Sequence, residues 1–154
     1  MSLSHVNEHG KASMVDVSGK PRIRRTARAF ARIALQLETI RLIRENAVRK
    51  GDVLAAARIA AIAGAKKTWE LIPLCHNISI DKIEVSFSVL DRAVEITGEA
   101  VCTDRTGIEM EALTAVSIAA LTIYDMCKAV DASMRIEEIR LLEKRKETGG
   151  ASEF

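Results

Sequence analysis

The segment from residue 106 to residue 130 carries two carboxylates and a lysine whose spacing suits one face of a helix. At 100° per residue, four polar residues fall within about 80° of one another: Glu111, Thr114, Thr122 and Asp125. Lys128 lies about 60° beyond Asp125. Carboxylates at both ends of such a stripe, with a lysine one turn further on, can transfer protons or hold a polar substrate. The alternative is the solvated face of an amphipathic helix, although Ile118 makes that face partly apolar.

The protonation state of these carboxylates depends on their surroundings. Burial would raise the pKa of Glu111 or Asp125, and a lysine as close as Lys128 would lower it. Both outcomes are open at this point, and either one would indicate a functional site if the shift is large.

A second candidate is the pair Cys75–His76, which follows Leu74 and Pro73 and precedes a strand pattern. Pro73 ends any helix, so the pair is expected in a loop at the edge of a sheet. Histidine beside cysteine can form an acid–base pair or a metal site. No further Cys or His lies nearby to complete a metal shell, so we expect no metal site; a solvent-facing histidine is the alternative.

Basic residues gather at four breaks in the apolar pattern: Lys20 with Arg22, Arg24 and Arg25; Arg49–Lys50; Lys66–Lys67; and Lys144–Arg145–Lys146. Such loops suit a polyphosphate, especially next to glycines that allow close backbone approach. Ordinary solvated surface charge is the alternative. Neither a GxxxxGK[ST] nor a GxGxxG motif is present, so P-loop and Rossmann phosphate sites are excluded.

Composition narrows the functional classes. The 154 residues include 23 Lys+Arg and 21 Asp+Glu, a formal charge of +2, and only 3% aromatic residues. A general nucleic-acid binder is usually more basic, and a single-strand binder more aromatic. The longest uncharged run, residues 112–124, is too short to span a membrane, and no secretory signal is recognisable. Three well-separated cysteines are consistent with reduced thiols in the cytoplasm.

The hydrophobic periodicity predicts a single domain of strands and helices, and these elements must position the candidate residues. It predicts strands at 27–36, 82–89, 94–102 and 134–142, and helices at 38–48, 52–66 and 106–129. Asp52 is the expected N-cap of the second helix, and Thr106–Glu109 has the spacing of a capping box. We therefore expect an α+β ferredoxin-like fold, an antiparallel sheet with helices packed on one face. The single domain spans residues 1–154, with a flexible arm at 1–20 and a flexible tail at 143–154.

Several of these segments resemble the blocks of a known family. WELIPLCHNISI at 69–80 and TGIEMEALTAVSIAALTIYDMCKAV at 106–130 closely resemble the signature segments of molybdenum cofactor biosynthesis protein C. MVDVSGK at 14–20, KGDVLAAARIA at 50–60 and IRLLEK at 139–144 are similar to its remaining blocks. The resemblance covers about residues 5–150 in the family's order.

The resemblance implies a fold, an assembly and a reaction. It implies ferredoxin-like subunits assembled as a homohexamer, a trimer of dimers, with active sites at subunit interfaces. It also implies a lyase that converts 3′,8-cyclo-7,8-dihydro-GTP, made by an upstream radical-SAM enzyme, into cyclic pyranopterin monophosphate, releasing pyrophosphate. No resident cofactor is implied, although magnesium can accompany the triphosphate.

The matching motifs also imply residue roles. They make Asp125 the active-site acid with Lys128 as its partner. By the chemistry of their side chains, His76 and Glu111 can supply further acid–base groups. The residues expected to line the substrate are Leu74, Cys75, His76, Glu109, Met110 and Glu111. The basic positions associated with the triphosphate and the reacting ring are Lys50, Lys66, Arg25 and Lys144.

The chain departs from the family's pattern in two places. Asn77 stands where the family usually has proline, and the tail after Lys144 is longer, so Lys144 or Lys146 can fill the tail-lysine role. Two other classes remain as alternatives. A nucleotide- or RNA-binding ferredoxin-like module would bind polynucleotides with a steep salt dependence. A structural assembly subunit would carry the Glu111–Asp125 stripe only as surface or interface.

Overall fold

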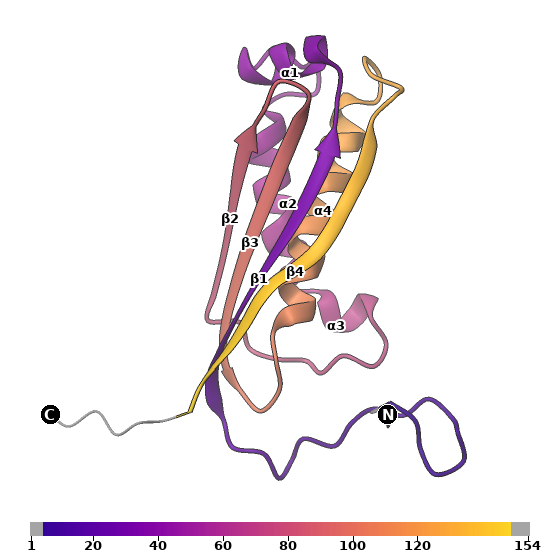
Figure 1. Cartoon of the computed structure of the whole chain (residues 1–154), viewed down its shortest axis with the longest axis vertical. Coiled ribbons are helices and arrows are strands. Elements are labelled where there is room, and N and C mark those ends of the chain that lie inside the picture. Colours follow the sequence, from indigo (N-terminus) through magenta and orange to yellow (C-terminus); the bar gives the residue numbers. More distant parts are fainter. Residues whose placement is uncertain (1–4, 149–154) are drawn as a thin grey trace, which may run out of the picture.

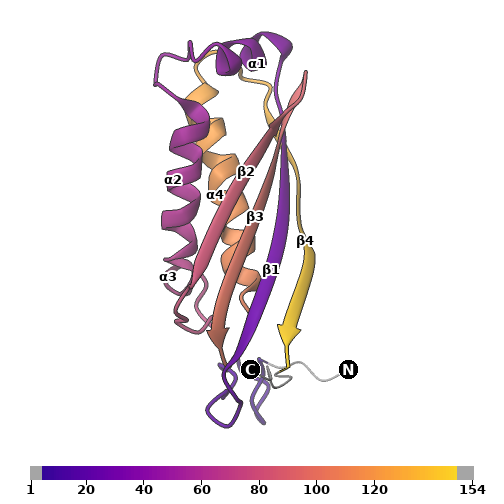
Figure 2. The ribbon, with the colours of Figure 1, turned by 90° about the vertical axis from the view of Figure 1, so that its left-hand side faces the viewer.

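The computed structural model describes residues 5–148 and contains one four-stranded antiparallel sheet covered by helices. The elements are β1 (Ile23–Ala34), α1 (Leu37–Arg44), α2 (Val53–Ala65), α3 (Thr68–Leu71), β2 (Lys82–Val89), β3 (Ala93–Asp104), α4 (Glu109–Cys127) and β4 (Arg135–Glu147). The strand order is β2-β3-β1-β4, and every neighbouring pair is antiparallel. Helices α2 and α4 lie side by side on one face of the sheet (Figures 1 and 2). The expected ferredoxin-like α+β fold is confirmed.

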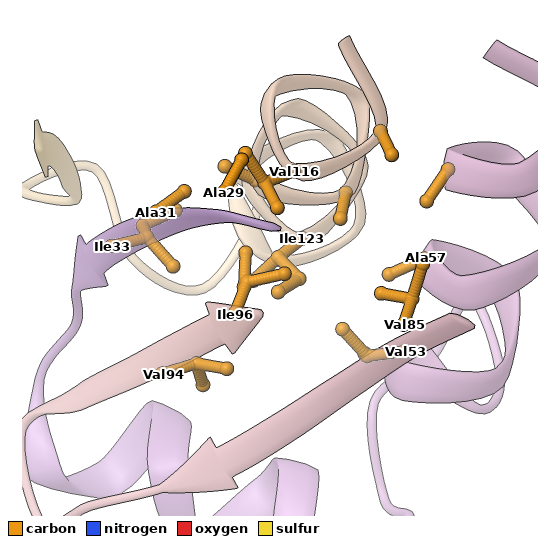
Figure 3. Packing of buried hydrophobic residues seen from close by; sticks show 14 of the residues in the cluster. Ala29, Ala31, Ile33, Val53, Ala57, Val85, Val94, Ile96, Val116 and Ile123 are labelled. Carbon is orange, nitrogen blue, oxygen red and sulfur yellow. The ribbon is translucent and has the colours of Figure 1, made fainter. Parts of the chain in front are cut away.

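Small residues bring α4 close to the sheet. Four inward positions of β1 are fully buried, and three of them are alanines: Ala27, Ala29, Ala31 and Ile33. Gly98 of β3 lies under the same helix, where an added Cβ would come 3.0 Å from Cγ1 of Val116. Val116 and Ile123 then fill the space between helix and strands (Figure 3). By length and composition alone α4 could cross a membrane, but here it is a core helix packed against β1, β3 and α2.

Helix α2 begins as its sequence predicts. The Asp52 side chain accepts a hydrogen bond from the Ala55 backbone N–H at 3.0 Å, the expected N-cap. Gly64 lets α2 approach α4, because a Cβ there would lie 2.7 Å from Cγ1 of Ile118. The short α3 that follows was not expected; its Thr68 hydroxyl is buried and donates to the Ala65 carbonyl.

The predicted capping box at Thr106–Glu109 is wrong. Helix α4 begins at Glu109, its N-cap is Ile108, and no side chain caps it. Ile108 is 1% exposed, so its burial in the core, rather than a polar cap, determines where the helix starts. Glu109 and Glu111 in the first turn suit the positive end of the helix dipole. The helix ends at Cys127, two residues before the expected end.

Strands β1 and β4 extend further than their patterns predicted, β1 at its start and β4 at its end. β1 begins at Ile23, and β4 continues to Glu147, so residues 143–147 belong to the sheet rather than to a flexible tail. Backbone pairing with β1 continues to Arg24↔Glu147. This extension was not visible in the sequence because β4 is an edge strand whose last residues are charged on both faces. The rest of the predicted tail, from residue 149, lies outside the described residues.

The predicted N-terminal arm contains no strand of the sheet and no helix between residues 5 and 20, but it is locally ordered by hydrogen bonds. Val6 and Ala12 form an isolated antiparallel bridge. The flexibility expected for this arm stays a prediction, and its residues 1–4 lie outside the described part of the chain.

Candidate functional site

Helix α4 places the candidate residues at two opposite ends of the molecule. Its first turn lies beside α3, and its last turn lies near α1 (Figure 1). At 1.5 Å per residue, the backbones of Glu111 and Asp125 are about 21 Å apart. We call the cavity around Glu109–Glu111 the first-turn site, and the group Lys50, Asp125 and Lys128 the last-turn cluster. One chain therefore carries two separate groups of candidate residues.

The last-turn cluster is a carboxylate held between two ammonium groups. Nζ of Lys128 lies 2.8 Å from Oδ1 of Asp125, and Nζ of Lys50 lies 2.8 Å from Oδ2. The Lys50 amine also donates to the Asp125 backbone carbonyl at 2.9 Å. These lysines lower the pKa of Asp125 to about 2, with the Lys128 hydrogen bond as the largest cause. The same bond raises the pKa of Lys128, so Asp125 and Lys128 are both charged at neutral pH.

Glu111 dominates the first-turn site and differs sharply from Asp125. Its side chain is buried, with the residue 4% exposed. Burial raises its pKa to about 7, and the nearby charge of Glu109 adds to the shift, although a backbone hydrogen bond opposes it. A carboxyl that titrates near neutral pH can both give and take a proton, which makes Glu111 suited to acid–base catalysis.

The cavity beside Glu111 has a volume of about 160 Å³. It brings together the two motif segments that the sequence singled out, and its lining residues are His5, Leu74, Cys75, His76, Ile78, Thr106, Gly107, Glu109, Met110 and Glu111. All of the residues predicted to line the substrate are therefore found together. Its size and mixed lining suit a polar ring.

His76 and Cys75 have different chemical capacities in this cavity. Nε2 of His76 lies 2.7 Å from the carbonyl oxygen of Val15. A carbonyl only accepts, so this contact places the proton on Nε2 and leaves Nδ1 as the nitrogen that can accept one. Burial raises the pKa of Cys75, and the charges of Glu111 and Glu109 raise it further, so its thiol stays protonated. Cys75 is thus a contact residue here rather than a thiolate nucleophile.

A basic cavity of about 290 Å³ adjoins the first-turn site. Both cavities are lined by Thr106, Gly107 and Glu109, so they meet at the loop before α4. The other lining residues of the basic cavity are Lys20, Arg25, Thr26, Ile108, Arg105, Lys144, Arg145 and Lys146. Six of these eight side chains are cationic, an arrangement that suits several phosphates. A ring in one cavity and a polyphosphate in the other would be neighbours.

The two candidate tail lysines both reach this cavity. Lys144 and Lys146 are two positions apart on β4 and therefore share a face of the strand. Nζ of Lys144 lies 3.5 Å from Oε1 of Glu109. Both lysines line the cavity, so the choice between them stays open.

Arg25 lines the basic cavity, but its guanidinium already donates hydrogen bonds to backbone carbonyls. It is 7% exposed, and its guanidinium donates to the carbonyls of Asp104 at 3.0 Å and Arg105 at 3.1 Å. It therefore shapes the loop that leads into α4. Lys66, at the C-cap of α2, forms no ion pair with residues 5–148 and lines neither cavity, so its predicted role stays a prediction.

Some lining residues were not among the predicted site residues. Lys20 belonged to a basic group seen in the sequence, and Arg105 directly precedes the TGIEME motif, so proximity to motifs could have identified both. Nothing in the pattern around His5 indicated a site. Within residues 5–148, no group of three or more His, Cys, Asp or Glu side chains is arranged to hold a metal ion.

Comparisons with known proteins agree with this geometry. A family model described as "MoaC family" matches residues 14–148. A protein of Peptoclostridium acidaminophilum named "Cyclic pyranopterin monophosphate synthase" is 51% identical over 99% of this chain and 95% of its own length. Proteins of the same name from Streptomyces coelicolor and Streptomyces avermitilis are each 54% identical over 97% of this chain and 86% of their own length. The chain therefore belongs to the MoaC family.

Proposed function

We infer that this chain is a cyclic pyranopterin monophosphate synthase, a lyase of molybdenum cofactor biosynthesis. It converts 3′,8-cyclo-7,8-dihydro-GTP into cyclic pyranopterin monophosphate and releases pyrophosphate. The observation that carries this function is the junction of the two cavities: buried Glu111, with a pKa of about 7, lies next to a cavity lined by six cationic side chains. A substrate that combines a reactive ring with a triphosphate needs both a carboxyl that exchanges protons with the ring and a cationic cavity that binds the phosphates.

The charges indicate how the substrate lies. The triphosphate occupies the basic cavity, where Lys144 and its neighbours on β4 neutralise its oxygens. The guanine-derived ring then extends past the Thr106–Glu109 loop into the first-turn site. There Glu111 and Nδ1 of His76 exchange protons with the ring nitrogens and oxygens during ring opening and closure. When the cyclic phosphate forms, the departing pyrophosphate keeps its contacts with the basic side chains.

The last-turn cluster completes this site from another subunit. Within one chain, the backbone of Glu111 is about 21 Å from that of Asp125 and about 25 Å from that of Lys128, too far for these groups to act on the same ring. Leu121 and Val130 near the cluster are each 54% exposed. Exposed apolar residues beside a charged cluster favour a protein contact there. We therefore propose that the two groups meet across an interface within a homohexamer, a trimer of dimers.

Mixed oligomers test the shared site. Glu111→Gln disables the first-turn site and Lys128→Ala disables the last-turn cluster, so each variant alone should keep no more than about 1% of wild-type pyrophosphate release. Co-expression of the two with different tags should restore about a quarter of wild-type activity, because one site in four receives both intact groups at random assembly. Co-expressed Asp125→Asn and Lys128→Ala, both altered in the same cluster, are the matched control and should stay inactive.

Mixed oligomers without restored activity would show that the two groups do not complement each other across an interface, and would overturn the shared site. Native mass spectrometry of the same preparations reports whether the subunits exchanged and whether the assembly is hexameric.

The substrate is supplied by a radical-SAM GTP cyclase, and we place the enzyme with it in the cytoplasm. No nucleic acid and no membrane is required. The triphosphate brings its own oxygen ligands, so magnesium would be bound mainly by the substrate. Activity that survives chelation by EDTA would show that the basic side chains alone suffice; activity lost and restored by Mg²⁺ would show that the ion takes part.

A further inference from the structure

The N-terminal arm forms a small hairpin before it reaches β1. Asn7 organises it: its backbone N–H donates to the Lys11 carbonyl, and its side-chain oxygen accepts from the backbone N–H groups of His9 and Lys11 at 3.0 and 2.9 Å. Ser13 then donates to the carbonyl of His5 at 2.9 Å. The side chain of Asn7 therefore controls the direction of a loop that begins at His5.

This hairpin lies against the first-turn site. The carbonyl of Val15, two residues after the hairpin closes, contacts Nε2 of His76 at 2.7 Å. The side chain of His5 lines the cavity beside Glu111. Every other lining residue comes from residues 74–78 or 106–111, so His5 adds a wall from a third part of the chain.

We propose that His5 is a substrate-binding residue that the N-terminal hairpin holds in the first-turn site. This inference rests on the proposed function. An imidazole carries one donor and one acceptor when neutral, which matches the alternating N–H and C=O groups of a guanine-derived ring. Leu74, Ile78 and Met110 supply apolar surface in the same cavity, so His5 adds a directional polar contact. Asn7 acts as a positioning residue, because it shapes the loop without lining the cavity.

Two histidines of the same hairpin allow a matched experiment. His5→Ala should weaken binding of 3′,8-cyclo-7,8-dihydro-GTP about tenfold, the usual effect of one lost hydrogen bond to a ligand. Binding is measured by calorimetry in the Lys128→Ala background, where turnover is about 10³-fold slower, and kcat/KM is measured by pyrophosphate release in the otherwise wild-type enzyme. His9→Ala removes an exposed imidazole four residues away that does not line the cavity, and it should leave both quantities unchanged.

Two further variants separate contact from architecture. His5→Gln keeps a donor and an acceptor and should recover most of the affinity. Asn7→Ala releases two backbone N–H groups and should weaken binding less than His5→Ala does. Thermal unfolding of every variant should match that of the wild type, since the hairpin lies outside the core.

Pyrophosphate release by the wild type tests the proposed function, and the comparison of His5→Ala with His9→Ala tests the role of His5. If the wild type turns over the substrate and His5→Ala binds and reacts like His9→Ala, His5 is not a substrate contact. If the wild type itself releases no pyrophosphate, the proposed function fails first.

Discussion

The two ends of α4 carry carboxylates of nearly the same chemistry in opposite states. Glu111 lies in the first turn, where burial is the largest cause that raises its pKa to about 7. Asp125 lies in the last turn, more than half exposed, and two lysines lower its pKa to about 2. The same helix thus provides one group that exchanges protons at neutral pH and one that stays ionised.

This difference indicates a division of labour between the two groups. At the first-turn site burial outweighs the backbone hydrogen bond that opposes it, and the charge of Glu109 adds to the shift, so Glu111 is suited to proton transfer. At the last-turn cluster ion pairing outweighs the small desolvation, so Asp125 stays ionised and holds two lysine side chains in place. A site that combines the first-turn site of one subunit with the last-turn cluster of another has residues that transfer protons on one side and residues that stabilise charge on the other.

Loss of the last-turn cluster should have the largest effect. Lys128→Ala and Asp125→Asn should each lower kcat/KM by about 10³-fold, because they remove a positioned charge from the reacting groups. Folding should be unaffected, since exposed ion pairs add little stability. Pyrophosphate release and circular dichroism measure the two properties. Lys67→Ala, another exposed lysine that lines neither cavity, should behave like the wild type; an equal loss there would mean that general surface charge matters.

Loss of the first-turn carboxyl should reduce activity about 10²-fold and change the pH profile. The kcat/KM of the wild type should bend near pH 7, where Glu111 titrates, and this bend should be absent in Glu111→Gln. Infrared spectroscopy gives an independent measurement: a protonated carboxyl band present at pH 5, fading near pH 7 and missing from Glu111→Gln. A band that disappears near pH 4 would show that the pKa of Glu111 is not raised, and Glu111 and Asp125 would then both be ionised at neutral pH.

The stability of the protein should also reveal the difference. The folded pKa of Glu111 lies above its ordinary 4.5, so the folded state binds more protons between pH 4.5 and 7 and loses stability as pH rises through that window. Glu111→Gln removes this loss and should raise the free energy of unfolding at pH 8 by up to about 3 kcal/mol, with little change at pH 4. Urea denaturation at both pH values measures it.

Asp125→Asn is the control for that experiment. Its carboxyl is ionised in both the folded and unfolded states from pH 5 to pH 8, so the substitution should not change how stability varies across this range. A gain at pH 8 comparable to that of Glu111→Gln would mean that the effect comes from net charge rather than from burial.

The sequence predicted those elements whose local pattern and packing agree. The alternation in 82–89 and 94–102 became β2 and β3, and Asp52 became a cap, because each depends on neighbours along the chain. The motif residues at both ends of α4 were recognised as candidates, and the structure brings the 74–76 and 109–111 residues into one cavity.

The features that the sequence did not predict correctly all depend on tertiary contacts. The Thr106 spacing satisfied a capping rule, but burial of Ile108 started the helix later. The end of β4 pairs through its backbone, which a charged sequence does not reveal. Spacing on a helix could place Glu111 and Asp125 on one face, but only packing decides that the first is buried and the second exposed. The approach of His5 to the cavity depends on a hairpin closed by Asn7, a contact that no periodicity encodes.

The smallest expected effect concerns the pKa of Asp125 itself. Lys50→Ala removes one of its two ammonium partners, so the pKa should rise from about 2 but stay below its ordinary value of 3.8. Lys128→Ala should raise it further, because the Lys128 hydrogen bond is the larger cause of the shift. Titration of the carbon-13 carboxyl resonance of Asp125 measures both. Equal pKa shifts in the two variants would mean that both lysines contribute equally to the pKa of Asp125. An unchanged titration would mean that ion pairing does not lower this pKa, so the contrast between Glu111 and Asp125 could not be explained by burial at one end of α4 and ion pairing at the other.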